Sequence, residues 1–255
     1  MKNKIENIYS KKIFRSIHGY PTKIKSITLF AKLWFRKRIN IIRYGSAGPD
    51  PFKIIYVNPE EIEKISSRKV PSHKSRFEDL GKIKGGNWDK KDIAQAYVKN
   101  EKKKFYNFYF KPYFSKSCFF KSLERRFKKK EPWENTSYYD YCESKKEINT
   151  DKRLNNIDLL FRSIKEAGFK SKTEIENDLV LDRLDDIMVD INRNGEFMFI
   201  ENRHRLAIAR ILGIEKIPVR VVCRHKKWQE KRFQAANTEE KNKKFEDHPD
   251  LQNLL

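Results

Sequence analysis

Two alternating apolar runs on either side of Asn194-Gly195 constrain the fold more strongly than any other feature of this chain. The apolar residues occupy every second position before the pair and again after it: Ile187, Val189 and Ile191, then Phe197 and Phe199. Such alternation gives each strand one apolar face, and Asn-Gly favours a type I′ turn because both residues tolerate positive φ. The sequence therefore predicts an antiparallel hairpin closed by a type I′ turn.

The hairpin leads into a helix through a very short connection. Glu201-Asn202-Arg203-His204-Arg205 separates the second strand from an apolar helical segment, Leu206 to Leu212. Ile217 to Val222 has the composition of a last strand, and apolar residues at helical spacing predict a helix over 154–164 that stops at Gly168. The order helix, hairpin, tight turn, helix, strand predicts an α+β (α/β) fold in which helices pack on a small mixed sheet.

The rest of the chain divides by composition. Residues 1–50 are expected to be a basic N-terminal extension that ends in a Gly- and Pro-rich linker. The main domain is expected over 51–230; it opens with a strand over 52–57 and a short helix from Pro59, and it carries an inserted helical region over about 81–150. Residues 231–255 are polar and predict a helix or a frayed tail.

The charge of the chain indicates the class of partner. Lys and Arg number 57 against 35 Asp and Glu, a net charge of +22 that favours polyanionic partners. An AT-rich genome also produces an excess of Lys, Asn and Ile, so the charge does not by itself indicate function.

Cysteine, histidine and apolar spacing exclude several classes of protein. The three cysteines lack Cys-x-x-Cys spacing and predict neither a disulfide framework nor a zinc ribbon. The five histidines lack metal-ligand spacing, so no dedicated metal site is predicted. The longest apolar run, Ile27 to Phe35, is too short to span a bilayer. We therefore expect a cytoplasmic protein, free or peripheral to the membrane or nucleoid.

The connection between hairpin and helix predicts an anion site. A strand that leads directly into a helix points the free N–H groups and the positive end of the helix dipole at the sheet edge. Arg203, His204 and Arg205 place cationic groups in the first helical turn, where each costs up to about 1 kcal/mol unless an anion binds. The alternative is that Arg203 and Arg205 are solvated or pair with carboxylates such as Glu201.

This order of motifs resembles the N-terminal domain of the ParB family, in the ParB/sulfiredoxin superfamily. About half of the chain carries the resemblance: the strand over 54–57 with Pro59, the helix over 154–168, the hairpin, the segment 200–209 and the Ile-Pro-Val strand from Ile217. Asn202 stands where glycine is usual, a mild departure because Asn tolerates a left-handed backbone. With the segments around Trp88 and Trp133, the chain is also similar to ParB-like proteins of archaea, whose function the resemblance does not supply.

The resemblance implies binding of a nucleoside di- or triphosphate, with its phosphates on Asn202, Arg203, His204 and Arg205. By alternation, Arg220 and Arg224 share one face of the last strand and could add a further basic contact. Sulfiredoxin chemistry is excluded because the catalytic cysteine of that family falls at Arg203. Kinase-like members carry an Asp at the position of Glu201 and a His-Arg pair like His204-Arg205.

Transfer or hydrolysis of phosphate therefore stays open. Such chemistry needs a carboxylate that orients the acceptor or holds Mg²⁺ carried by the nucleotide. The candidates are Glu201, Asp89 and Glu134, with His204 beside them. A complete DNA partition clamp is not expected, because only a short polar segment follows Val222.

Two further functions involve residues 1–43. Apolar residues at helical spacing, flanked by cations, predict a basic amphipathic helix: Ile24, Ile27, Phe30, Leu33 and Trp34. Such a helix could contact DNA in a non-enzymatic nucleic-acid-binding module, or lie on an anionic membrane as a surface adaptor. Packing against its own domain is the ordinary alternative. We expect the aromatic residues over 105–120, and Trp88, to pack in the core rather than against a nucleobase.

Overall fold

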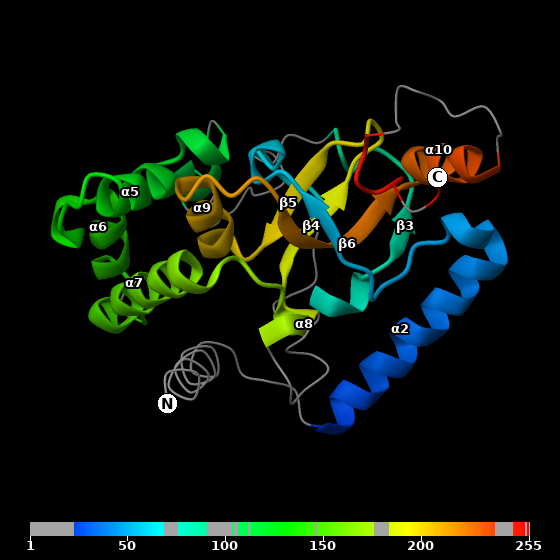
Figure 1. The fold of residues 1–255 in the computed structure, drawn as a ribbon, viewed down its shortest axis with the longest axis horizontal. Coiled ribbons are helices and arrows are strands. Elements are labelled where there is room, and N and C mark those ends of the chain that lie inside the picture. Colours follow the sequence, from blue (N-terminus) through cyan, green and yellow to red (C-terminus); the bar gives the residue numbers. More distant parts are fainter. Residues whose placement is uncertain are drawn as a thin grey trace.

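The computed structural model describes residues 23–68, 76–90, 104, 107–111, 113–145, 147–175, 184–237, 247–252 and 254. Figure 1 shows a central sheet with a helical lobe at one end and a long helix, α2, along the other. In chain order the α-helices, 3₁₀ helices (η) and strands are α2 (Lys23–Tyr44), η1 (Gly45–Ala47), β1 (Ile55–Val57), η2 (Pro59–Glu61), β2 (Lys64–Ile65), η3 (Arg76–Asp79), β3 (Lys82–Lys84), η4 (Phe114–Lys116), α5 (Cys118–Phe127), η5 (Trp133–Asn135), α6 (Ser137–Glu143), α7 (Thr150–Ala167), α8 (Lys172–Ile175), β4 (Ile187–Ile191), β5 (Phe197–Glu201), α9 (Arg203–Ile211), β6 (Ile217–His225) and α10 (Lys226–Asn237).

Within these residues the strands form one six-stranded mixed sheet in the order β1-β6-β4-β5-β2, with β3 also paired to β6. The strands β4 and β5 are antiparallel, as the hairpin pattern predicts, and β6 is parallel to β4 and antiparallel to β1. Alternate residues of the central strands enter two cores: Val189 and Val221 enter the main one, and Met188 and Val222 the one beneath α2. The expected α+β fold is confirmed.

The hairpin turn differs from the type I′ turn that Asn194-Gly195 predicts. Of residues 192–196, all of which the structure describes, Gly195 alone has positive φ, at 98°. The Asn192 side chain accepts hydrogen bonds from the backbone N–H groups of Asn194 and Glu196, both at 2.9 Å. These hydrogen bonds stabilise a loop longer than a type I′ turn, in which Gly195 is the one residue that needs positive φ. The prediction of a hairpin is right and the prediction of its turn type is wrong.

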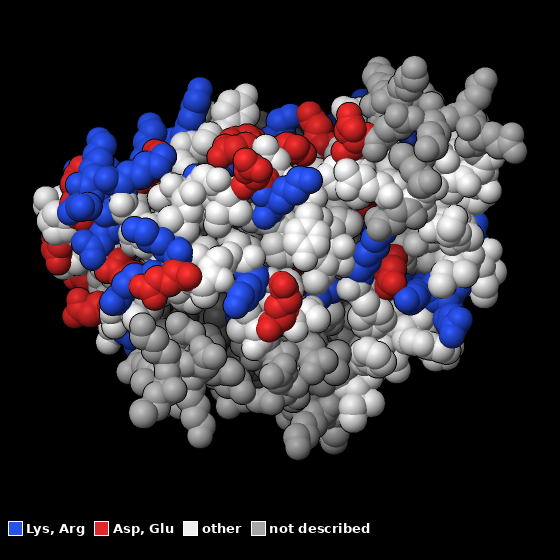
Figure 2. Space-filling view, viewed as in Figure 1, with Lys and Arg blue, Asp and Glu red and all other residues white. Residues whose placement is uncertain are grey.

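The helical lobe consists of α5, α6 and α7, and α9 lies between this lobe and the sheet (Figure 1). The helix predicted over 154–164 is part of α7, which ends before Gly168 as expected. Most aromatic side chains of 105–120 that the structure describes pack in the core, as predicted: Tyr109, Phe110, Phe114, Phe119 and Phe120 are buried. Tyr113 is the exception, because its side chain is exposed. Lys and Arg side chains gather on the surface over α5, where Lys121 and Lys128–Lys130 are exposed (Figure 2).

The predicted amphipathic helix of the extension is α2, and residues 1–22 of that prediction lie outside the described part. One face of α2 packs on the domain. Leu33 is fully buried among Leu80, Met188 and Val222, and the Asn40 side chain donates hydrogen bonds to Pro49 O and Gly81 O. No helix of the described residues has the length and apolar character needed to cross a membrane.

Candidate functional site

Asn202 joins β5 to α9 in the left-handed conformation, with φ 71° and ψ 44°. This confirms that asparagine can take the backbone geometry for which glycine is usual. The Asn202 side chain does not cap α9; its Nδ2 donates to Asp185 O at 3.1 Å and to Asp186 O at 2.7 Å. The first-turn N–H groups of α9 therefore receive no side-chain oxygen from the N-cap, and the positive end of the helix dipole stays uncompensated by it.

Arg203 lies on the side of this turn that faces the helical lobe. Its guanidinium carbon is 4.3 Å from the centre of the Tyr109 ring. Arg153 of α7 lies beside the same aromatic cluster and donates through Nε to Tyr138 Oη at 2.7 Å. Among the described residues, no carboxylate lies within ion-pair distance of Arg153. Two guanidinium groups thus flank the start of α9 at the edge of the lobe.

His204 is held in the same cluster and faces away from the sheet. Its Nε2 lies 3.0 Å from Tyr138 Oη, and its ring packs edge-on against Phe119. Burial lowers the pKa of His204 well below its ordinary value, and the charges of Arg203 and Arg153 add to this effect. Tyr138 Oη accepts a hydrogen bond from Arg153 Nε, so the hydroxyl proton of Tyr138 is left to donate to Nε2 of a neutral His204. His204 therefore docks α9 onto α6.

Arg205 and Arg220 converge on one carboxylate that the sequence analysis did not single out. Arg220 Nε lies 3.1 Å from Asp186 Oδ2, and Arg205 Nη1 lies 3.9 Å from Asp186 Oδ1. The remaining nitrogens of Arg220 donate to Phe52 O and Thr173 Oγ1, and Arg205 Nη2 donates to Lys170 O. The alternative that Arg205 pairs with a carboxylate thus holds, although that carboxylate is Asp186 and not Glu201.

Burial dominates the electrostatics of this group. It lowers the pKa of Arg205 and of Arg220, with Asp186 opposing the shift in both. It also raises the pKa of Asp186, although both arginines favour the charged carboxylate. Asp185-Asp186 stands directly before the first hairpin strand, which is the signal in the sequence. Two adjacent aspartates do not by themselves predict a contact with Arg220. Asp186 reaches Arg220 only because β4 pairs in parallel with β6, a strand that is distant in sequence.

The structure brings one of the three candidate carboxylates to the turn. Glu201 is half-buried, and its Oε1 accepts a hydrogen bond from Asn202 N at 3.4 Å. Glu134 is exposed in η5 on the lobe. Asp89 lies at the opposite end of the hairpin, where it pairs with Arg193 at 2.6 Å. Burial favours neutral Asp89, but the Arg193 hydrogen bonds prevail and lower the pKa of Asp89 to about 2. Asp89 and Glu134 are thus not grouped with Glu201.

Trp88 packs in the interior, as predicted, where its ring lies against His225. In the described part of the chain, no three His, Cys, Asp or Glu side chains are placed to hold a metal ion. Comparison with models of protein families, with curated proteins and with solved structures finds no match for this chain. Function is therefore inferred from the geometry of the α9 turn and its surroundings.

Proposed function

We propose that this protein binds a nucleoside di- or triphosphate at the start of α9, with the phosphates on the Glu201–Arg205 turn. The observation that carries this proposal is the left-handed Asn202, which begins a nine-residue helix with no side-chain cap. Backbone N–H groups at such a helix start point outward, and the helix dipole favours negative charge there. Membership of the ParB/sulfiredoxin superfamily is part of the same proposal.

The cations around the turn support a phosphate ligand. In this proposal Arg203 and Arg153 contact the phosphates, because both lie at the edge of the lobe beside the turn. Arg205 and Arg220 are held by Asp186, so in this proposal they fix the position of the turn and add positive charge near the phosphates, rather than contact them directly. The Tyr109 ring packs against the Arg203 guanidinium and the Tyr138 hydroxyl accepts from Arg153, and both rings are buried, so neither of them is available to stack on a nucleobase.

Glu201 is the candidate carboxylate for chemistry at this site. In a phosphotransferase or a nucleoside triphosphatase it would accept the proton of the attacking hydroxyl or water, or hold Mg²⁺ that arrives with the nucleotide. The oxygen of the attacking group would then bond to the terminal phosphorus, and the bond from phosphorus to the bridging oxygen would break. Asp89 and Glu134 lie elsewhere in the structure and take no part in this step.

The binding test compares two charge-removing variants. We expect Arg203→Gln to weaken the binding of ADP and ATP by about one to two decades, since a charge-assisted hydrogen bond contributes roughly 1.5 to 3 kcal/mol. The control is Lys128→Gln, because Lys128 is exposed directly after α5 and pairs with Glu124 of that helix. Titration calorimetry measures both. Equal losses in the two variants, or no binding by the natural chain, would refute the site.

A second measurement separates an enzyme from a binding protein. We expect Glu201→Gln to nearly abolish the release or transfer of phosphate while nucleotide affinity stays within about threefold, because the carboxylate acts on the attacking group. Phosphate release and transfer to a panel of hydroxyl acceptors are the readouts. Nucleotide binding without turnover in the natural chain would leave the binding proposal standing and remove the enzymatic one.

A membrane-surface function is the second candidate, and the exposed face of α2 favours it. Ile27, Phe35 and Ile42 are 70%, 63% and 83% exposed, whereas Leu33 on the opposite face is buried. Lys and Arg residues lie along the same helix, so its exposed surface combines apolar and basic side chains. Co-sedimentation of the full chain with anionic vesicles, with Phe35→Ser as the variant, tests this. Binding that is lost at high salt and unchanged by Phe35→Ser would indicate charge attraction alone, without insertion of the apolar face, and would count against this function.

A further inference from the structure

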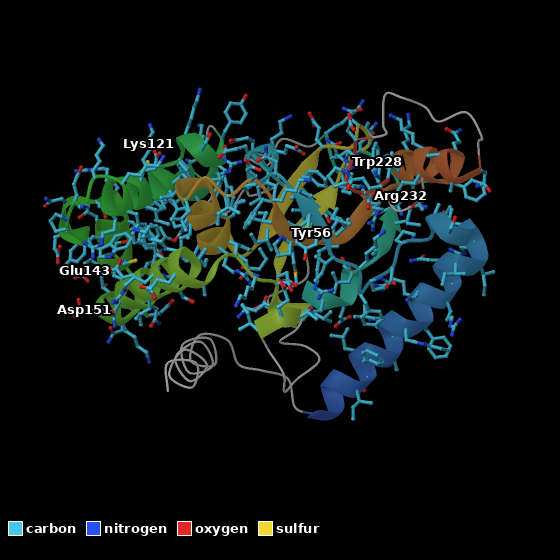
Figure 3. All side chains as sticks on the ribbon, in the orientation of Figure 1. Tyr56, Lys121, Glu143, Asp151, Trp228 and Arg232 are labelled. Atoms are coloured by element: carbon cyan, nitrogen blue, oxygen red, sulfur yellow. The ribbon has the colours of Figure 1, made fainter. Side chains whose placement is uncertain are left out.

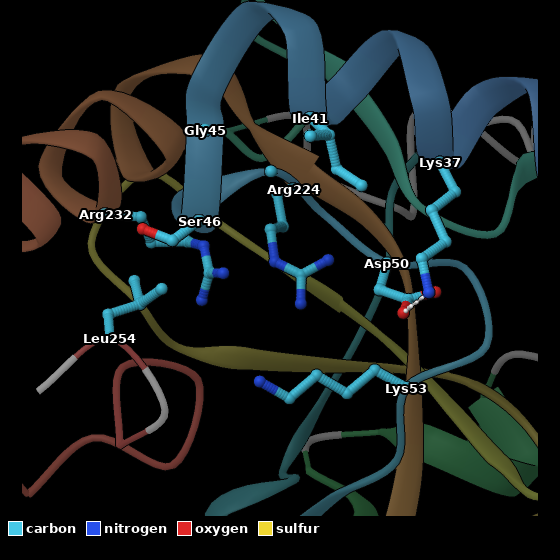
Figure 4. Close-up of a pocket in the computed structure, with 10 residues that line it drawn as sticks. Lys37, Ile41, Gly45, Ser46, Asp50, Lys53, Arg224, Arg232 and Leu254 are labelled. Atoms are coloured by element: carbon cyan, nitrogen blue, oxygen red, sulfur yellow. Dashed lines mark ion pairs between the residues drawn. The ribbon is translucent and has the colours of Figure 1, made fainter.

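A cavity lies far from the α9 turn, between α2, the C-terminal part of β6 and α10. Its volume is about 330 Å³. Four cationic side chains line it: Lys37, Lys53, Arg224 and Arg232. Figure 4 shows the Lys53 amine and the two guanidinium groups pointing into the same open space. Cations from α2, the segment before β1, β6 and α10 thus converge on this cavity.

The carboxylates around this cavity do not balance its cations. Lys37 pairs with Asp50 at 2.7 Å. Arg224 and Arg232 share Asp250, at 2.5 and 2.9 Å. Lys53 has no ion-pair partner within the described residues, so four positive charges face two negative ones. Burial lowers the pKa of Lys53, and the charges of Arg232 and Arg224 lower it further.

Arg224 carries the argument for a ligand. It is 2% exposed, and its Nε and Nη2 hold both oxygens of Asp250, at 2.9 and 2.5 Å. Its Nη1 has no hydrogen-bond partner among the described residues, although it is shielded from solvent. A buried donor without a partner is costly, and native proteins rarely leave one unexplained. An anion in the cavity would supply the acceptor that Arg224 Nη1 lacks.

We propose that this cavity binds a small molecule with a phosphate monoester group, whose phosphate contacts Arg224 Nη1 and Lys53 Nζ. A dianionic phosphate matches the excess of two positive charges, and guanidinium and ammonium groups are its usual partners in proteins. Ile41 and Leu254 line the same cavity and supply apolar walls for the organic part of the ligand. The volume is near the lower limit of small-molecule sites, which excludes large ligands.

This site is separate from the nucleotide site proposed above. Arg220 and Arg224 are four positions apart on β6, which is about 13 Å along a strand. Arg220 belongs to the Asp186 group near the α9 turn, whereas Arg224 belongs to the Asp250 group under α10. Each site can therefore be disabled by substitutions that leave the other in place.

Titration calorimetry on the full chain tests the proposal with three probes: inorganic phosphate, glycerol 3-phosphate and AMP. We expect at least one probe to bind, and Lys53→Gln to weaken it by about tenfold, the loss of one charge-assisted contact. Lys53→Arg keeps the positive charge and should keep most of the affinity. Lys116→Gln removes an exposed cation on η4 and is the matched control, with no expected effect.

The order of the three affinities identifies the ligand. Tighter binding of glycerol 3-phosphate or AMP than of phosphate supports an organic phosphate, whereas equal binding of all three overturns the role of the apolar walls. Absence of binding by every probe overturns the site. So does a loss in Arg203→Gln as large as that in Lys53→Gln, because the phosphate would then lie at α9. If Lys53→Gln does not fold, a thermal shift of the natural chain by phosphate that persists in Arg203→Gln decides the question.

Discussion

Two buried carboxylates hold β6 to its neighbours by the same arrangement, but only one of the two clusters lines the cavity described above. Asp186 is shared by Arg220 of β6 and Arg205 of α9, and Asp250 is shared by Arg224 of β6 and Arg232 of α10. Figure 3 shows Trp228 and Arg232, both residues of α10, at the end of the sheet away from the helical lobe. Each group holds two guanidinium charges and one carboxylate.

The difference lies in what surrounds the donors that the carboxylate does not bind. Around Asp186, every guanidinium nitrogen of Arg220 has an oxygen partner, from the carboxylate, Phe52 O or Thr173 Oγ1. Around Asp250, Arg224 Nη1 has none among the described residues, and the group borders a cavity with Lys53. Within the described part of the chain, the Asp186 cluster also leaves one buried donor without a hydrogen-bond partner, Arg205 Nη1, but the free donor of the Asp250 cluster, Arg224 Nη1, belongs to a residue that lines a cavity with Lys53. Shared charge alone therefore does not distinguish a structural cluster from a binding one.

Removal of either carboxylate should give the largest effect. We expect Asp186→Asn and Asp250→Asn each to lower the free energy of unfolding by about 3 to 5 kcal/mol, because two buried guanidinium groups lose their counter-charge. Urea unfolding measures this. Phosphate should recover part of the loss in Asp250→Asn and none in Asp186→Asn, since only the first borders the cavity. Equal responses of the two variants to phosphate would contradict the comparison.

Gly195→Ala tests how the Asp250 group is supported. A Cβ at Gly195 would lie 2.6 Å from the Trp228 ring, and Trp228 Nε1 donates to Asp250 at 3.0 Å. We expect a loss of about 2 to 3 kcal/mol from overlap and backbone strain together, measured by thermal unfolding. Gly213→Ala is the control, because its φ is also positive but nothing lies within 4 Å. That variant should lose only about 1 kcal/mol from the backbone. Similar losses in both would exclude the Trp228 contact as the cause.

The pH dependence of stability should have opposite signs in the two groups. Burial raises the pKa of Asp186, whereas Arg224 and Arg232 overcome burial and lower the pKa of Asp250. A raised pKa contributes stability at low pH that is lost as pH rises, and a lowered pKa contributes stability that is lost as pH falls below about 3.8.

The variants make this measurable. As pH falls from 7 towards 4, the destabilisation caused by Asp186→Asn should grow, by at most about 1.4 kcal/mol per pH unit. Below about pH 3.8 the destabilisation caused by Asp250→Asn should shrink, because the unfolded natural chain takes up the proton first. Urea unfolding at a series of pH values follows both. The same trend in both variants would show that the two carboxylates have similar surroundings.

Local patterns in the sequence predict the part of the fold that surrounds the candidate site. The alternation from Ile187 to Phe199 predicts β4 and β5, and helical spacing predicts α7 and α9. Asn202 takes the left-handed conformation expected of it. These features follow from residues close in sequence, where periodicity and backbone preference decide the outcome. The predicted turn type is wrong because another local interaction, the hydrogen bonds that the Asn192 side chain accepts, outweighs the Asn-Gly preference.

The buried charge clusters cannot be predicted in this way. Asp250 lies in a polar segment whose composition predicts a helix or a frayed tail, yet it is buried and holds two arginines and Trp228. Asp186 meets Arg220 only through the parallel pairing of β4 with β6, which links distant segments. Similarly, Asp89 meets Arg193 across the fold, which separates it from Glu201. Such contacts depend on topology, and composition carries no signal for them.

The most direct test of the central claim is an amide NMR titration with ADP. The claim is that phosphates bind the backbone N–H groups at the start of α9. We predict that the amide signals of Arg203, His204 and Arg205 show the largest shifts, and that these shifts persist in Lys53→Gln. Unchanged signals for these three amides at saturating ADP, with shifts confined to residues around Lys53 and Arg224, would contradict the claim and place nucleotide binding in the cavity beneath α2.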